Sequence, residues 1–129
     1  MADAIYPKAL EQMLQGGIDM TGTVKAALVS AGYTYSAGHQ YYNAASSYAV
    51  GTPQTLTGKT FSLGIFNADD PTFSALTGSV VVAIVIYIDT GLDSTSPLVA
   101  FISQATGLPF TPSGGSATIP WNASGIFQL

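Results

Sequence analysis

Cysteine is absent from the 129 residues of this chain, so neither a disulfide nor a thiolate metal site can form. Arginine is absent too, and Lys8, Lys25 and Lys59 are the only lysines. Contacts to phosphate require Lys and Arg, and the chain carries a net charge of −4. We therefore expect no nucleic-acid partner.

Charged residues of either sign are scarce, at 8% of the sequence against about 25% in an average soluble domain. So few surface charges suggest that other protein covers much of the surface. The alternative is a plain β-domain coated in Ser, Thr and Gly, and composition alone leaves that reading open.

No apolar run approaches the roughly 20 residues that a membrane-spanning helix needs. The segment Met1–Ala4 also lacks the positive and apolar regions of a signal peptide. We expect no membrane partner, and synthesis in the cytoplasm.

The longest apolar run, Val80–Ile88, is almost entirely β-branched and lies between Gly78-Ser79 and Asp89-Thr90-Gly91. It does not alternate with polar residues, which predicts a strand covered on both faces. A second layer of sheet could cover it, or a neighbouring subunit could.

The rest of the chain predicts one mainly β domain over residues 1–129, an antiparallel sandwich or barrel with one short helix. Pro7 suits the first turn of a helix over 6–15, which Gly16-Gly17 would end. Thr-Gly pairs at 57–58, 77–78, 90–91 and 106–107 predict tight turns. Strands are expected, within 23–129, at 23–29, 48–50, 59–61, 65–68, 72–76, 80–89, 98–103, 117–121 (an edge or bulged strand, because of Pro120) and 126–129.

The segment 33–48 is rich in Tyr, Ser, Gly and Ala, the composition of adaptable binding surfaces, and reads as a long excursion with a helical turn near 40–45. Its tyrosines could form an interface or fold back over the edge of the sandwich. The apolar face of the helix must also dock on something. The candidate interface residues are Tyr33, Tyr35, Tyr41, Tyr42, Tyr48, Leu10, Met13 and Leu14.

Asp89-Thr90-Gly91 follows an apolar strand, as does the active-site loop of retroviral-type aspartic proteases, in which two subunits each supply one Asp. Little chain follows it for the rest of such a fold, and no clear partner motif is present. Asp-Thr-Gly is also a good turn, because Asp binds backbone amides and Gly adopts positive φ. The turn is the favoured interpretation.

Other chemical signals are weak. Asp69-Asp70-Pro71 with Asn67 lacks the ligand spacing of a calcium loop and is better explained as a turn. His39 is the only histidine, so one chain can form neither a histidine metal cluster nor a Ser-His-Asp triad. We expect no catalytic, cofactor-binding or metal site, and no enzyme.

The order and spacing of several segments resemble a family of small structural proteins of tailed-bacteriophage virions. The resemblance covers most of the chain, and the Tyr-rich excursion matches least. The matching segments are 23–29, 56–60, 66–73, 83–91, 96–102, 106–115, the region of Trp121, and 126–129.

The resemblance implies a capsid decoration or cement protein, which sits on the outer capsid as a trimer and joins neighbouring capsomers. Its partners would be the major capsid protein and copies of itself, and its location the capsid surface of the virion. The family has no catalytic residues to transfer. A head–tail connector, neck or tail protein is the first alternative, and a carbohydrate-binding sandwich using Trp121 and the tyrosines is another.

Overall fold

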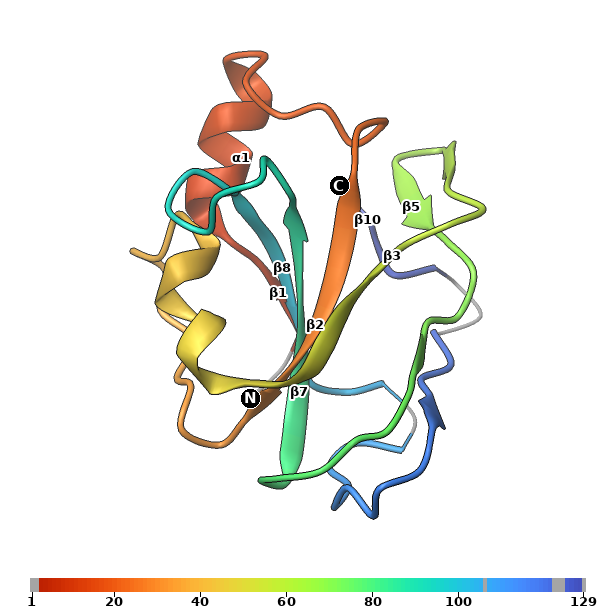
Figure 1. The fold of residues 1–129 in the computed structure, drawn as a ribbon. Helices are drawn as coiled ribbons and strands as arrows, with labels where there is room; N and C mark the ends of the chain where they lie inside the picture. The colour runs from red at the N-terminus through yellow and green to blue at the C-terminus, as the bar shows by residue number, and fades with distance from the viewer. Residues whose placement is uncertain (1–2, 106, 122–124, 129) are drawn as a thin grey trace.

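The computed structural model describes residues 3–105, 107–121 and 125–128. It is mainly β, with antiparallel sheets and one helix of more than a single turn, which confirms the predicted fold class. The largest sheet has five strands in the order β1-β8-β7-β2-β3 (Figure 1). Their bounds are β1 Ala4–Ile5, β8 Leu98–Ile102, β7 Val81–Ile88, β2 Val24–Ser30 and β3 Ala49–Thr55.

Strand β7 lies at the centre of this sheet, between β2 and β8, and alternate residues enter two separate cores. Ile84 and Ile86 belong to one core, whereas Ala83 and Val85 belong to the other, and all four are fully buried. The prediction that both faces of this strand are covered is therefore confirmed. This chain supplies both covers itself.

Helix α1 (Pro7–Leu14) and the Tyr-rich excursion cover one face of the five-stranded sheet. The excursion holds two short 3-10 helices, η1 (Tyr42–Ala44) and η2 (Ser46–Tyr48), which Figure 1 shows in yellow to the left of the strands. The core on this face contains Tyr6 and Ala9 from the helical segment and Tyr33, Tyr42 and Ala45 from the excursion.

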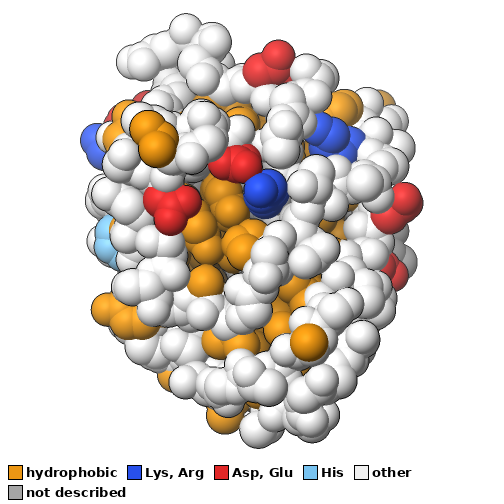
Figure 2. Space-filling view, in the orientation of Figure 1, with side chains coloured by type: hydrophobic (Ala, Val, Ile, Leu, Met, Phe, Trp, Pro, Cys, Tyr) orange, Lys and Arg blue, Asp and Glu red, His pale blue; other side chains and the backbone are white. Residues whose placement is uncertain are grey.

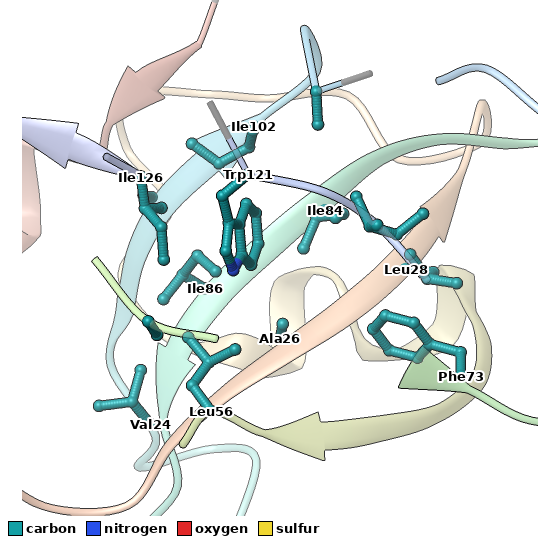
Figure 3. Close-up of a cluster of buried hydrophobic side chains, with 14 of the residues drawn as sticks. Val24, Ala26, Leu28, Leu56, Phe73, Ile84, Ile86, Ile102, Trp121 and Ile126 are labelled. Atoms are coloured by element: carbon teal, nitrogen blue, oxygen red, sulfur yellow. The ribbon is translucent and has the colours of Figure 1, made fainter. Parts of the chain in front are cut away.

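Two small antiparallel sheets and the C-terminal segments cover the other face. One sheet has the order β10-β5-β4 and the second pairs β6 with β9. Trp121 lies among the side chains of this core, near Ile86, Ile102 and Ile126 (Figure 3). The bounds are β4 Thr60–Ser62, β5 Ile65–Asn67, β6 Thr72–Phe73, β9 Ala117–Thr118 and β10 Phe127–Gln128.

The predicted helix end is confirmed in detail. Gly16 has φ +76°, its N–H donates to Met13 O at 3.2 Å, and the N–H of Gly17 donates to Gln12 O at 2.7 Å. These are the two hydrogen bonds of a Schellman motif. Gly58, Gly78, Gly91 and Gly107, from the predicted Thr-Gly turns, also have positive φ.

Several predicted boundaries were wrong. The strand expected at 117–121 ends at Thr118, before Pro120, which has no N–H to give to a ladder. The strand expected at 72–76 ends at Phe73, and Ala75 has φ +52°, outside the strand region. β3 runs on to Thr55, past the predicted end at 50. Strand β1 was not predicted, because two residues carry no periodic signal. Of the strand expected at 126–129, the last residue lies outside the described residues.

Candidate assembly surface

Two of the candidate interface tyrosines are core residues. Tyr33 and Tyr42 are 5% and 3% exposed, and the ring of Tyr42 stacks on that of Tyr87 with centroids 3.9 Å apart. The Tyr33 hydroxyl lies 2.5 Å from the Tyr6 hydroxyl and 2.9 Å from Nδ1 of His39. The expectation that Tyr33 and Tyr42 face a partner is corrected, because folding back over the sheet buries both rings.

Burial also changes the acidity of these phenols. It raises the pKa of Tyr42 to about 12 and is the largest cause of the raised pKa values of Tyr6, Tyr33 and Tyr87. The ionised form of a buried phenol loses its hydration, so the neutral form is favoured. These tyrosines therefore act as packing groups, and the hydroxyls of Tyr6 and Tyr33 are hydrogen-bonded to each other.

The remaining excursion tyrosines are more open. Tyr35 and Tyr41 are half-buried, Tyr35 against the ring of Phe101 with centroids 5.6 Å apart. Tyr48 is 40% exposed. Tyr48 is thus the excursion tyrosine with the most surface free for contact.

The helix presents more apolar surface than the core can use. Ala9 is fully buried and Met13 is half-buried, but Leu10 is 39% exposed and Leu14 is 90% exposed. The predicted apolar face therefore exists, yet only part of it docks on this chain. Leu10 and Leu14 line an open hollow of about 540 Å³. The other lining residues are Ile5, Met13 and Gln128.

Beside the helix lies another feature, which we call the apolar groove, an open hollow of about 380 Å³ between α1, the segment after it and the β10-β5-β4 sheet. Met13 borders both hollows. None of the described residues that line the groove is charged. Its lining residues are Met13, Ile18, Met20, Phe61, Ser62, Leu63, Gly64, Ile65, Phe66 and Phe127.

The groove has the volume of a small-molecule site, but its side chains offer little to orient a polar ligand. Such sites place a few polar groups to orient a ligand. Among the described residues of the lining, Ser62 carries the only polar side chain. Contact with an apolar surface of another protein suits this lining better.

Leu63 lies at the tip of the hairpin that joins β4 to β5, and the sequence analysis did not single it out. It is 88% exposed, with φ +52°, and Gly64 follows it with φ +76°. Positive φ at both central residues defines a type I′ turn, for which Asn-Gly is strongly preferred. A leucine there is both strained and exposed. Such strain is commonest at functional sites.

Charge lies around these features rather than within them. Lys59 precedes β4, but its ammonium donates to the carbonyl oxygens of Met20, at 3.0 Å, and Gly22. On the helix, Lys8 and Glu11 pair with each other at 3.4 Å. Figure 2 shows one face of the molecule, on which few side chains are charged and hydrophobic side chains are visible across the middle.

Asp89 forms a turn, as favoured by the sequence. Its Oδ1 accepts from the N–H of Gly91 at 2.9 Å, and Gly91 has φ +96°. Its Oδ2 lies 2.8 Å from Nζ of Lys25, an ion pair between β2 and the end of β7 that was not predicted. The Lys25 ammonium and the Gly91 N–H lower the pKa of this carboxyl. A protease dyad instead shares a proton between carboxylates, which raises one pKa.

The acidic pair Asp69-Asp70 also forms a connection between strands. Oδ1 of Asp70 accepts from the N–H of Trp121 at 3.0 Å, and Asp69 O accepts from the indole N–H at 3.2 Å. Trp121 is 9% exposed, which places it in the core and leaves little ring for stacking on a sugar. Among the described residues, no group of three or more acidic or histidine side chains could hold a metal ion.

In the part of the chain that the structure describes, no helix has both the length and the apolar character to cross a membrane. Neither the models of known protein families nor the curated proteins contain a match to this sequence.

Proposed function

We propose that this protein is a structural subunit of a tailed-bacteriophage virion, a capsid decoration protein that binds the major capsid protein and copies of itself. The observation that carries the proposal is the uncharged apolar groove with Leu14 and Leu63 exposed beside it. Monomeric proteins seldom leave such surface open, and large apolar patches mark sites of protein contact.

Three further features support an assembly role. Charged residues make up only 8% of the sequence, so extensive contact costs little charge desolvation. The chain covers both faces of β7 itself, which leaves its outer surface for neighbours. The order of segments such as 66–73 and 83–91 resembles that of small virion proteins.

Cryo-electron microscopy of the virion that carries this chain tests the proposal. Density for the chain on the outer shell, touching the major capsid protein, is the expected result. Density confined to the neck or tail would keep the structural class and discard the capsid role. Its absence from the particle would overturn the proposal.

A further inference from the structure

The free edge of β4 differs from that of β3, an edge strand of the five-stranded sheet. All three residues of β4 are exposed, and it contains neither proline nor charge. Edge strand β3, by contrast, carries Pro53 and a bulge, with Gly51 at φ +76°. Proline, charge and bulges are the usual means by which proteins protect an edge from pairing with another chain.

The register of the hairpin shows which backbone groups this edge offers. Ser62 pairs with Ile65 across the two-residue turn, and Phe61 pairs with Phe66. In an antiparallel ladder, residues alternate between groups that bond the partner strand and groups that point away. Since Ser62 flanks the turn and bonds Ile65, the N–H and C=O of Phe61 point outward, where a further strand would lie.

We propose that β4 pairs antiparallel with β4 of a second copy of this chain, so that the apolar groove of each copy is covered by the other. The inference goes beyond the proposed function and rests on it only in that a structural subunit is expected to self-associate. It replaces the trimer that the resemblance implies with a two-fold pair. With a two-fold axis at Phe61, the Phe61 N–H of each copy donates to the Phe61 C=O of the other copy. The same patch serves both sides, as an isologous interface requires.

This pairing brings Leu63 to the groove of the other copy. With Phe61 opposite Phe61, residue 63 of one copy faces residue 59 of its partner. Lys59 is bound to the carbonyl of Met20, and Met20 lines the groove. The exposed, strained leucine at the hairpin tip is therefore placed against apolar lining of the second copy.

Charge favours this occupant, and the area that a specific interface needs indicates how much surface the occupant must cover. The groove carries no charge, and the ammonium of Lys59 is tied to two carbonyls, so two copies with a net charge of −4 meet on uncharged surface. A specific interface needs about 800 Å² from each partner. Three residues of edge strand cannot supply that area alone, whereas the edge together with Phe61, Leu63 and the groove brings in a broad apolar surface.

The first test is sedimentation of the full chain over a range of concentrations, with Leu63→Asn as the variant. Asn suits the type I′ turn, so the hairpin is kept while the apolar contact is lost. We expect dimers of the unmodified chain and at least a tenfold weaker dimer for the variant. Leu92→Asn, at a leucine 64% exposed in the β7–β8 connection, is the matched control and should dimerise normally.

Hydrogen exchange at the Phe61 amide gives a readout that does not depend on a substitution. The amide should become protected as concentration rises, because it is bonded only in the pair. A monomer at all concentrations, a closed trimer, or a dimer with an unprotected Phe61 amide would overturn the proposal. A chain found on the virion but monomeric in solution contradicts this inference alone. A dimer that is absent from the virion contradicts the proposed function alone.

Discussion

The carboxylate of Asp70 holds the backbone of Trp121 in place from 51 residues away, with Oδ1 accepting from the Trp121 N–H at 3.0 Å. The same strand connection binds the indole N–H through Asp69 O. Trp121 follows Pro120, beyond the end of β9. Trp121 is therefore held by acceptors of the 69–70 connection, one from a side chain and one from the main chain, and not by a strand ladder.

Asp70→Ala should lower the free energy of unfolding by about 1–3 kcal/mol, because the Trp121 N–H loses its partner in a partly buried place. Urea unfolding followed by the fluorescence of Trp121, the single tryptophan, measures the change. Asp70→Asn keeps an acceptor oxygen and is the control. Equal stability of the Ala variant and the unmodified chain would contradict the anchoring role.

Asp89→Asn should cost about 0.5–1 kcal/mol at neutral pH, since Asn can still accept from the Gly91 N–H but loses the ion pair with Lys25. The contacts lower the pKa of Asp89 in the folded chain. The contribution of Asp89 to folding stability is therefore complete above its unfolded-state pKa of about 3.9. It is lost as the pH falls through the lower folded-state pKa.

Denaturant unfolding of both proteins as a function of pH checks this prediction. The difference between them should be constant near neutrality and should shrink in the acid range below about pH 4. Lys25→Met should reproduce most of the neutral-pH loss. A difference that grows on acidification would have the wrong sign for an ion pair.

The sequence was sufficient to predict the fold class, because the signals for it are local. The uninterrupted run at 80–88 predicted a doubly covered strand, Gly16 predicted the helix end, and the Thr-Gly pairs predicted turns. The ion pair of Lys25 with Asp89 was missed, since it depends on which strands are neighbours. Sequence spacing alone does not give that order.

The surface was predicted less well than the fold. An apolar helix face and a set of tyrosines looked alike as candidates, but Tyr33 and Tyr42 are buried whereas Leu14 is 90% exposed. Which apolar residues find room inside is decided by the space over the sheet, a tertiary property. Leu63-Gly64 did carry a signal: a leucine where a two-residue hairpin turn favours Asn.

The chain should lose stability in alkali. The folded-state pKa values of Tyr6, Tyr33, Tyr42 and Tyr87 are raised, so their contribution is complete below the unfolded value of about 10 and is lost as pH rises above it. The ultraviolet absorbance of tyrosinate should show these four ionising only as the chain unfolds. Tyr42→Phe should reduce the loss of stability as the pH rises above about 10. Full titration of all seven tyrosines in a folded chain would contradict it.

Gly51→Ala should be strongly destabilising, by about 2–4 kcal/mol, because it combines two costs. Gly51 has φ +76°, and an added Cβ would collide with Cδ2 of Leu76, a fully buried residue. Gly16→Ala is the matched control: Gly16 has the same φ of +76° but no atom within 4 Å of an added Cβ. Thermal unfolding of both variants separates backbone strain from collision. Equal losses would mean that Leu76 moves aside without cost.

Leu63→Asn should raise the stability of the isolated chain while it weakens pairing. Leucine at φ +52° is strained by roughly 1 kcal/mol, and at 88% exposure it gains little from burial within its own chain. Asn tolerates this conformation, so a gain of about 0.5–1 kcal/mol is expected in dilute solution, where the monomer dominates. Denaturant unfolding at low protein concentration measures it. A loss of stability there would mean that Leu63 serves the folding of its own hairpin, and would remove the reason to assign it to an interface.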